Sequence, residues 1–229
     1  MEKSLQREVK VVFDESLVAA IKKHELKQVH LVIGKESVIQ HDAASAGLEL
    51  NKVAMLTGKD GLTTQRGLVV VPASDPAMQI SDLRDVRIYF GPKECDEKHS
   101  AALRLFVKHG VDQPAKLETA VACDEGAINI LDLAKKGSRG CAVISSYAKP
   151  LLEGCGQVPK GTLRVVGETE EVPFIAAFVN EAAEKDSPAT LTQALLKATA
   201  SDISLRIALE TKRGFIEVDG NDNDIAKKK

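Results

Sequence analysis

The sequence contains few aromatic residues. Six phenylalanines, two tyrosines and no tryptophan make up 3% of the 229 residues, so a core must be built mainly from valine, leucine, isoleucine and alanine. Stacking surfaces for bases or sugar rings are correspondingly scarce. An excess of one charge is also lacking, because 31 basic residues are balanced by 33 acidic ones and the formal net charge is −2. Without a basic patch, we expect no nucleic-acid partner.

Long apolar segments are absent as well. No uninterrupted apolar run approaches the roughly 20 residues needed to cross a bilayer, and Met1–Lys10 contains no apolar core of a signal peptide. We therefore expect no insertion into a membrane. We also expect a chain from which any export signal was removed, or in which it never existed.

The short motifs of common enzymes are missing. The chain has no GxSxG elbow, HExxH helix, GxxxxGK[ST] loop or GxGxxG turn. Its four cysteines show neither a CxxC pair nor the spacing of a zinc finger, and we expect each to be a free, mostly buried thiol. We therefore predict a protein that is not an enzyme and needs no cofactor.

The sequence does contain an alternation of strand-like and helix-like segments. Short apolar runs favour strands at residues 9–12, 29–33, 53–56, 68–71, 86–90, 117–122, 141–144, 163–166, 174–179 and 214–218. Apolar residues at helical spacing favour helices at residues 15–24, 102–107, 127–134 and 188–198, the last with Ser187 as N-cap and Pro188 at the first position. This alternation predicts the α/β class, with mostly parallel sheets and helices on both faces.

Two breaks in composition divide the chain. One lies at Pro72–Pro76 and the other near Glu168–Pro173, and we interpret them as two chain crossings between lobes. Residues 1–71 and 172–229 would form the first lobe, and residues 72–171 the second. The hinge is then expected in Leu68–Pro72 and Val166–Pro173.

Several segments resemble one family of transport proteins. Gly67–Pro76 and Ile80–Gly91, which reads ISDLRDVRIYFG, are similar to a hinge strand and the segment that follows it in the phosphate/phosphonate-type solute-binding proteins of ABC transporters. The resemblance covers nearly the whole chain and includes Ser16–Ser37, Gly140–Tyr147, Leu163–Thr169 and Val172–Phe174. The family's opening strand and helix have no counterpart here, so we expect a fragment or trimmed relative with an incomplete first lobe.

This resemblance implies a two-lobed, type II periplasmic-binding-protein fold and a function in transport. A small anion such as phosphate or a phosphonate would be held in a cleft between the lobes, and its binding would favour a closed form. An ABC transporter permease, or a sensor domain in a longer chain, would detect that form. The family also implies a periplasmic or otherwise extracytoplasmic location.

Candidate ligand-binding residues lie in loops that follow predicted strands. In open α/β sheets, ligands bind beyond the carboxyl ends of the strands, where helix N-termini present backbone amides. The candidates are Lys35, Glu36, Ser37, Thr64, Cys95, Lys98, His99, Ser100, Ser145, Ser146 and Tyr147. The resemblance places the family's anion-binding hydroxyl turn at residues 95–100, where Asp96 and Glu97 replace small hydroxyl residues. These carboxylates would repel a dianion, or would simply cap the next helix.

Two other interpretations remain open. Cys95 and His99 are four residues apart, and on a helix this spacing would bring a thiol and an imidazole together for a soft metal. Further ligands would have to come from Glu36, His41 or Cys123, and the chain would be a metal-binding protein of the same fold. Alternatively, it is a sensory or regulatory module that no longer binds a solute.

Overall fold

The chain folds into two compact units joined by two crossings. The computed structural model describes residues 1–229 except 27, 113–116, 181, 183–186 and 219–229. The described residues within 1–64 and 173–229 form the first unit, and those within 65–172 form the second. At the crossings, β3 (Thr64–Gln65) and β9 (Val172–Pro173) form a two-stranded sheet. No helix in the described part of the chain is long and apolar enough to span a membrane.

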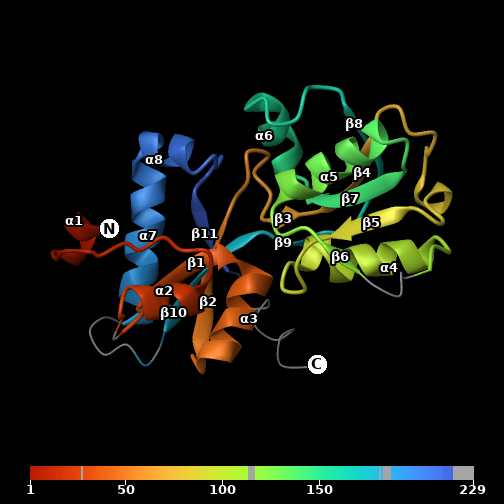
Figure 1. The fold of residues 1–229 in the computed structure, drawn as a ribbon. Coiled ribbons are helices and arrows are strands. Elements are labelled where there is room, and N and C mark those ends of the chain that lie inside the picture. Colours follow the sequence, from red (N-terminus) through yellow and green to blue (C-terminus); the bar gives the residue numbers. More distant parts are fainter. Residues whose placement is uncertain (27, 113–116, 181, 183–186, 219–229) are drawn as a thin grey trace. The chain divides into compact units, whose positions relative to one another are not determined.

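The first unit is a sheet with helices on both faces (Figure 1). Its strand order is β1-β10-β2-β11, with every pair antiparallel. Because successive residues of a strand point to opposite faces, Met55 packs with Leu17 and Ile39 on one face, whereas Ala54 packs with Leu195 on the other. The elements are α1 (Glu2–Leu5), α2 (Leu17–Lys23), β1 (Leu31–Lys35), α3 (Glu36–Ala46), β2 (Leu50–Leu56), β10 (Ile175–Asn180), α7 (Pro188–Ser201), α8 (Ile203–Ala208) and β11 (Phe215–Glu217).

The predicted strand at residues 9–12 is wrong. No strand is assigned to these residues, and the side chains of Val11 and Phe13 are exposed. The amide of Val9 donates to the carboxylate of Glu2 at 3.0 Å instead of to a neighbouring strand. β-branched residues favour strands because they fit the pleated, half-buried surface of a sheet. Residues 9–12 pair with no described strand, so this preference does not produce a strand here.

The second unit is also a sheet covered on both faces. Its strand order is β6-β5-β7-β4-β8. Phe90 and Phe106 lie in the core on one face, and Ile130 and Leu152 lie in the core on the other. The elements are β4 (Gly67–Pro72), the 3-10 helix η1 (Ile80–Asp82), β5 (Arg87–Phe90), the 3-10 helix η2 (Asp96–Lys98), α4 (Ser100–Lys108), β6 (Glu118–Thr119), α5 (Cys123–Lys135), β7 (Gly140–Ser145), α6 (Ala148–Gly154) and β8 (Leu163–Glu168).

The direction of the strands departs from the prediction, although the α/β class with helices on both faces is confirmed. Only the pairs of β5 with β6 and of β5 with β7 are parallel among those described in the two larger sheets. β4 runs antiparallel to β7 and β8, and β10 runs antiparallel to β1 and β2. β4 and β10 are the first strands after each crossing, and they enter their sheets against the direction of their neighbours. The expected mostly parallel sheets are therefore wrong.

The first crossing lies earlier than the sequence predicts. Residues 65–71, which the prediction assigns to the first lobe, belong to the second unit because β4 lies between β7 and β8 in its sheet. Leu68–Pro72 is accordingly a buried sheet strand and not a hinge. The second crossing falls between Val172 and Pro173, one residue from the predicted boundary. Residues 219–229 of the predicted first lobe lie outside the described residues.

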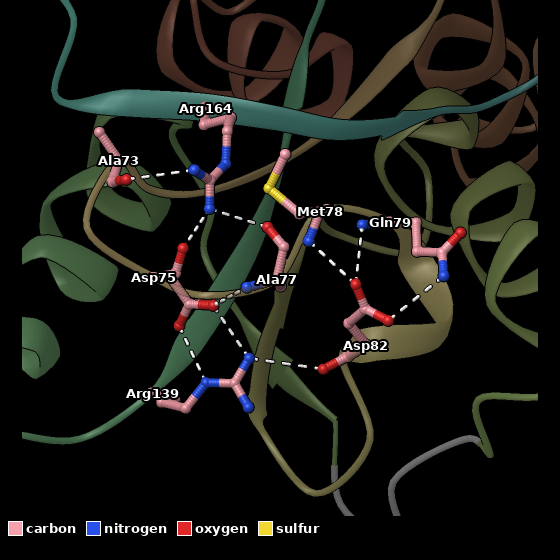
Figure 2. Close-up of polar contacts among 8 residues, drawn as sticks. All are labelled: Ala73, Asp75, Ala77, Met78, Gln79, Asp82, Arg139 and Arg164. Atoms are coloured by element: carbon pink, nitrogen blue, oxygen red, sulfur yellow. Dashed lines mark hydrogen bonds and ion pairs between the residues drawn. The ribbon is translucent and has the colours of Figure 1, made fainter.

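Two arginines hold the loop after β4 (Figure 2). Arg139 forms a two-point contact with Asp75, in which Nη2 lies 2.9 Å from Oδ1 and Nε lies 3.0 Å from Oδ2. Arg164 donates to the main-chain carbonyls of Ala73, Asp75 and Ala77. The hydrogen bond from Arg139 is the main cause that lowers the pKa of Asp75 from its ordinary value. Side-chain donors thus order a segment that has few ladder hydrogen bonds of its own.

We expect Asp75→Asn to lower the free energy of unfolding by about 2 kcal/mol at neutral pH, because Arg139 loses its charged acceptor. The pKa of Asp75 is lower in the folded state, so its contribution is complete above the unfolded value and is lost as pH falls through the folded value. Urea unfolding at neutral pH and at successively more acid pH would measure the difference between variant and wild type. A difference that does not shrink in acid contradicts the assignment. Asp60→Asn, at an exposed aspartate that accepts only the Leu62 amide, serves as control.

Candidate functional site

Three parallel strands of the second unit end at one edge of its sheet. β5 pairs in parallel with β6 and with β7, so their carboxyl ends share this edge. α4 follows β5 through the turn of residues 91–99, and α5 follows β6, so both helices begin here. Helix N-termini present unpaired amides. We call this region the carboxyl edge, and it contains the predicted turn at residues 95–100.

A buried carboxylate lies at the carboxyl edge. Glu97 of η2 is 1% exposed, and its Oε1 accepts a hydrogen bond from Oγ of Ser145, the last residue of β7, at 2.6 Å. The hydroxyl of Ser145 thus takes the place of water at one oxygen of this buried carboxyl group. Ser145 also contacts Cys123, the first residue of α5: its amide donates to Sγ at 3.4 Å, and the two side chains lie 3.6 Å apart. Glu97 therefore joins η2, the end of β7 and the start of α5.

Gly67 gives η2 the space to approach the sheet. A Cβ at this position would lie 2.0 Å from the backbone oxygen of Glu97, which no side chain allows. Thr169 closes the other side of Gly67, because its Oγ1 accepts the Gly67 amide at 2.8 Å and its own amide donates to the Gly67 carbonyl at 2.9 Å. The start of β4 is therefore held in place by Thr169 and packs directly against the backbone of η2 at Glu97.

Lys98 is a buried cation at the same edge. It is 3% exposed, and its Nζ donates to the Val121 carbonyl at 3.0 Å. Its stem crosses Gly91, where a Cβ would lie 2.4 Å from the Lys98 Cβ. Within the described part of the chain, no carboxylate pairs with this ammonium. Lysine is almost never fully buried unless it is paired, because burial of an uncompensated charge is costly.

The position of Lys98 beside α5 is suited to an anion. Val121 precedes Ala122, the N-cap residue of α5, and the cap lacks a side-chain hydrogen bond. The N-terminus of helix α5 and the buried ammonium of Lys98 therefore lie together, and both favour negative charge.

A family model for the periplasmic substrate-binding proteins of phosphonate ABC transporters matches residues 1–223. The chain belongs to this family.

Several solved structures share the fold of this chain. A binding protein component of an ABC phosphonate transporter from Pseudomonas aeruginosa is 13% identical, with 96% of this chain and 74% of that chain covered and a TM-score of 0.72. PhnD1 from Prochlorococcus marinus, solved in complex with methylphosphonate, is 15% identical, with 99% and 88% covered and a TM-score of 0.71. The alkanesulfonate-binding protein SsuA from Xanthomonas axonopodis, bound to MOPS, is 15% identical, with 84% and 62% covered and a TM-score of 0.53.

These similarities establish a type II periplasmic-binding-protein fold, as the resemblance in the sequence predicts. A comparison with curated proteins found no match. The family assignment made from Gly67–Pro76 and Ile80–Gly91 is confirmed.

The structure brings the predicted residues of the second unit to the carboxyl edge, but several point inward. Nδ1 of His99 lies 2.8 Å from the Gly91 carbonyl oxygen, and the ring packs edge-on against Phe90. Cys95 is buried, Ser100 is the first residue of α4, and Oγ of Ser146 accepts the Arg66 amide at 3.2 Å. Tyr147 is exposed. Lys98 and Ser145 are held by Val121 and Glu97, as described above.

The remaining predicted residues lie in the first unit. Lys35 ends β1, Ser37 is in the first turn of α3, and Thr64 is in β3 at the crossing. Glu36 begins α3 and forms an ion pair with Lys52, whose Nζ lies 3.2 Å from Oε2. Glu36 is therefore engaged within its own unit.

The metal-binding interpretation finds no support in the described residues. No group of three or more histidine, cysteine or carboxylate side chains there is arranged to hold a metal ion. Cys95 and His99 do not share a helix, because Cys95 precedes η2 and His99 separates η2 from α4. All four cysteines are free, as expected, but Cys155 is exposed and Cys123 only half-buried.

We expect Gly67→Ala to lower the free energy of unfolding by about 3 kcal/mol, because the added methyl group displaces the backbone of η2. Gly154→Ala is the matched control, because a Cβ at this position meets nothing within 4 Å. Gly154 is the last residue of helix α6. Guanidinium unfolding of the two variants measures the difference. Equal stability of both variants would show that η2 does not rest on Gly67.

Proposed function

We propose that this chain is a solute-binding protein that captures a small tetrahedral oxyanion, a phosphonate, phosphate or sulfonate, outside the cytoplasm and delivers it to an ABC transporter permease. The role requires no catalysis. Membership of the periplasmic phosphonate-binding family supports the class of function. The ligands of two structural neighbours, methylphosphonate and MOPS, support the class of solute, because both carry a tetrahedral oxyanion.

The buried ammonium of Lys98 is the observation on which the proposal rests. An ammonium has three N–H donors, and the Val121 carbonyl accepts one of them. An oxyanion at the carboxyl edge would accept the others and would give Lys98 the direct ion-pair partner that it lacks among the described residues. It would also lie beside the first amides of α5. Binding would thus offset the cost of burying Lys98.

The second unit supplies this part of the site from one rigid framework. Lys98 is positioned by Gly67 and Gly91, where larger residues do not fit, and by Glu97 through its bond to Ser145. That the solute lies between the two units stays a prediction from the sequence. The interpretation as a module that no longer binds a solute becomes the alternative outcome of the binding experiment.

We expect Lys98→Gln to weaken oxyanion binding at least about tenfold, because a hydrogen bond to a charged group contributes about 1.5–3 kcal/mol. A thermal-shift screen of phosphate, phosphite, methylphosphonate and methanesulfonate would first find which probes bind the wild type, and calorimetric titration would then compare the variants. Lys93→Gln removes an exposed lysine from the same turn and should leave binding unchanged.

Two results would contradict the proposal. If none of these anions binds the wild-type chain, the protein is not an oxyanion-binding protein and the sensory interpretation is favoured. If Lys98→Gln binds as tightly as Lys93→Gln, the buried ammonium does not contact the solute.

A further inference from the structure

We infer that two copies of this chain associate through the first unit, where residues 10–13 of each copy pair as a strand with the free edge of β1 in the other. Two features of the first unit lead to this interface: a sheet edge without a partner strand, and an extended segment without a sheet. The interface is independent of the proposed oxyanion site, which lies in the second unit.

β1 has one free edge. It stands at the end of its sheet and pairs with β10 alone among the described strands. Just beyond these strands, the amide of Asn180 donates to the carbonyl of His30 at 3.1 Å. Because hydrogen-bonded pairs alternate along an antiparallel ladder, the N–H and C=O groups of Leu31 and Ile33 point away from β10. Within the described part of the chain, these groups form no hydrogen bond.

The sequence of β1 does not protect this edge. Proteins usually block a free edge with a short strand, a bulge, a charged residue or a proline. The other edge strands of the two larger sheets have such protection: β6 and β11 have two and three residues, and β8 has a register shift opposite β4 and carries Arg164 and Glu168. In β1, Leu31–Gly34 contains neither a charge nor a proline, and the side chain of Ile33 is exposed. This edge is therefore open to a further strand.

Residues 10–13 have the character of a strand but no sheet. They read Lys-Val-Val-Phe and connect α1 to α2 without regular structure (Figure 1). Their N–H and C=O groups form no hydrogen bond with the rest of the described chain. Val11 is 64% exposed and Phe13 is 87% exposed. β-branched and aromatic residues favour a strand because they pack on a sheet, and a second copy can supply that sheet.

The segment is fixed at both ends. On one side, the amide of Val9 donates to the carboxylate of Glu2 at 3.0 Å. On the other side, Oδ2 of Asp14 lies 3.2 Å from Nζ of Lys23 in α2. A segment held at its ends loses less conformational freedom when it pairs than a free chain does. Residues 10–13 are thus prepared for an incoming edge.

A second copy is the partner that fits both features. Each copy carries the unpaired segment and the unprotected edge, so reciprocal pairing about a twofold axis uses both of them in one interface. The interface would cover Val11, Phe13 and Ile33, three apolar side chains that a single copy leaves in water. A strand from a different protein would occupy the edge of β1 but would leave residues 10–13 exposed.

Sedimentation equilibrium of the complete chain tests the inference. Between about 1 and about 200 μM, we expect a monomer–dimer equilibrium that shifts toward the dimer as concentration rises. Phe13→Ser should raise the dissociation constant about a hundredfold, because each copy loses one buried side chain and each loss costs about tenfold. Leu62→Ser removes an exposed apolar side chain from a loop outside the interface and should leave the dissociation constant unchanged.

Two further variants test the edge of β1. Ile33→Pro removes the outward N–H and keeps the bonds of β1 to β10, so it should weaken the dimer at least about tenfold. A mixture of Val11→Cys and Ile33→Cys chains, treated with a short bis-maleimide, should give a cross-link between the two different chains at these positions. Mass spectrometry of the joined peptides identifies it, and circular dichroism checks that each variant folds.

Three results would overturn the inference. A wild-type chain that stays monomeric at every concentration excludes the interface. A dissociation constant that is the same for Phe13→Ser and Leu62→Ser excludes residues 10–13 from it. Cross-links between two Ile33→Cys chains, in place of the mixed product, show that β1 pairs with β1. Oxyanion binding, measured separately by titration, stands or fails independently of these results.

Discussion

The hydrogen bond from Ser145 to Glu97 determines how the carboxyl edge is built. A buried carboxylate is stable only where donors replace its water, and Ser145 supplies one at 2.6 Å. This bond ties η2 to the end of β7, so the next residue, Lys98, extends toward Val121 at the start of α5. The parallel strands β5, β6 and β7 make the arrangement possible, because they bring the helix starts and the turn to one edge of the sheet.

Local patterns in the sequence were sufficient for much of the fold. The stripe of α5 and the N-cap of α7 are confirmed, since Ser187 accepts the Thr190 amide and Pro188 begins the helix. Strand direction was not predictable in this way, because β4 is as apolar as a central parallel strand and only its pairing with β7 and β8 reveals that it runs against them. The hinge was expected at Leu68–Pro72 because the composition changes at Pro72–Pro76 and because the segment resembles a hinge strand, whereas Gly67–Pro72 is a fully buried strand of the sheet.

The sequence indicated which loops of the second unit meet at one edge, but not how their side chains are oriented. Lys98, His99, Ser100 and Ser145 were expected near one another, and the structure places them at one edge. Their orientations depend on partners distant in sequence: Lys98 on Val121, and Ser145 on Glu97. Asp96 and Glu97 are adjacent acids with opposite fates, since one pairs with Arg104 at the surface and the other is enclosed. Periodicity cannot distinguish two neighbours in an irregular turn.

The loop after β4 illustrates how recognition of the main chain frees a surface to vary. Arg164 binds carbonyl oxygens at Ala73, Asp75 and Ala77, and every amino acid at these positions would offer the same oxygens. The side chain of Met78 beside them is exposed. Divergence at the exposed positions Ala73 and Met78 can therefore alter this patch without loosening the loop, whereas Asp75 is held by Arg139 and Ala77 by the core. A fluorescent dye or surface tether attached at position 78 would leave the sheet below undisturbed.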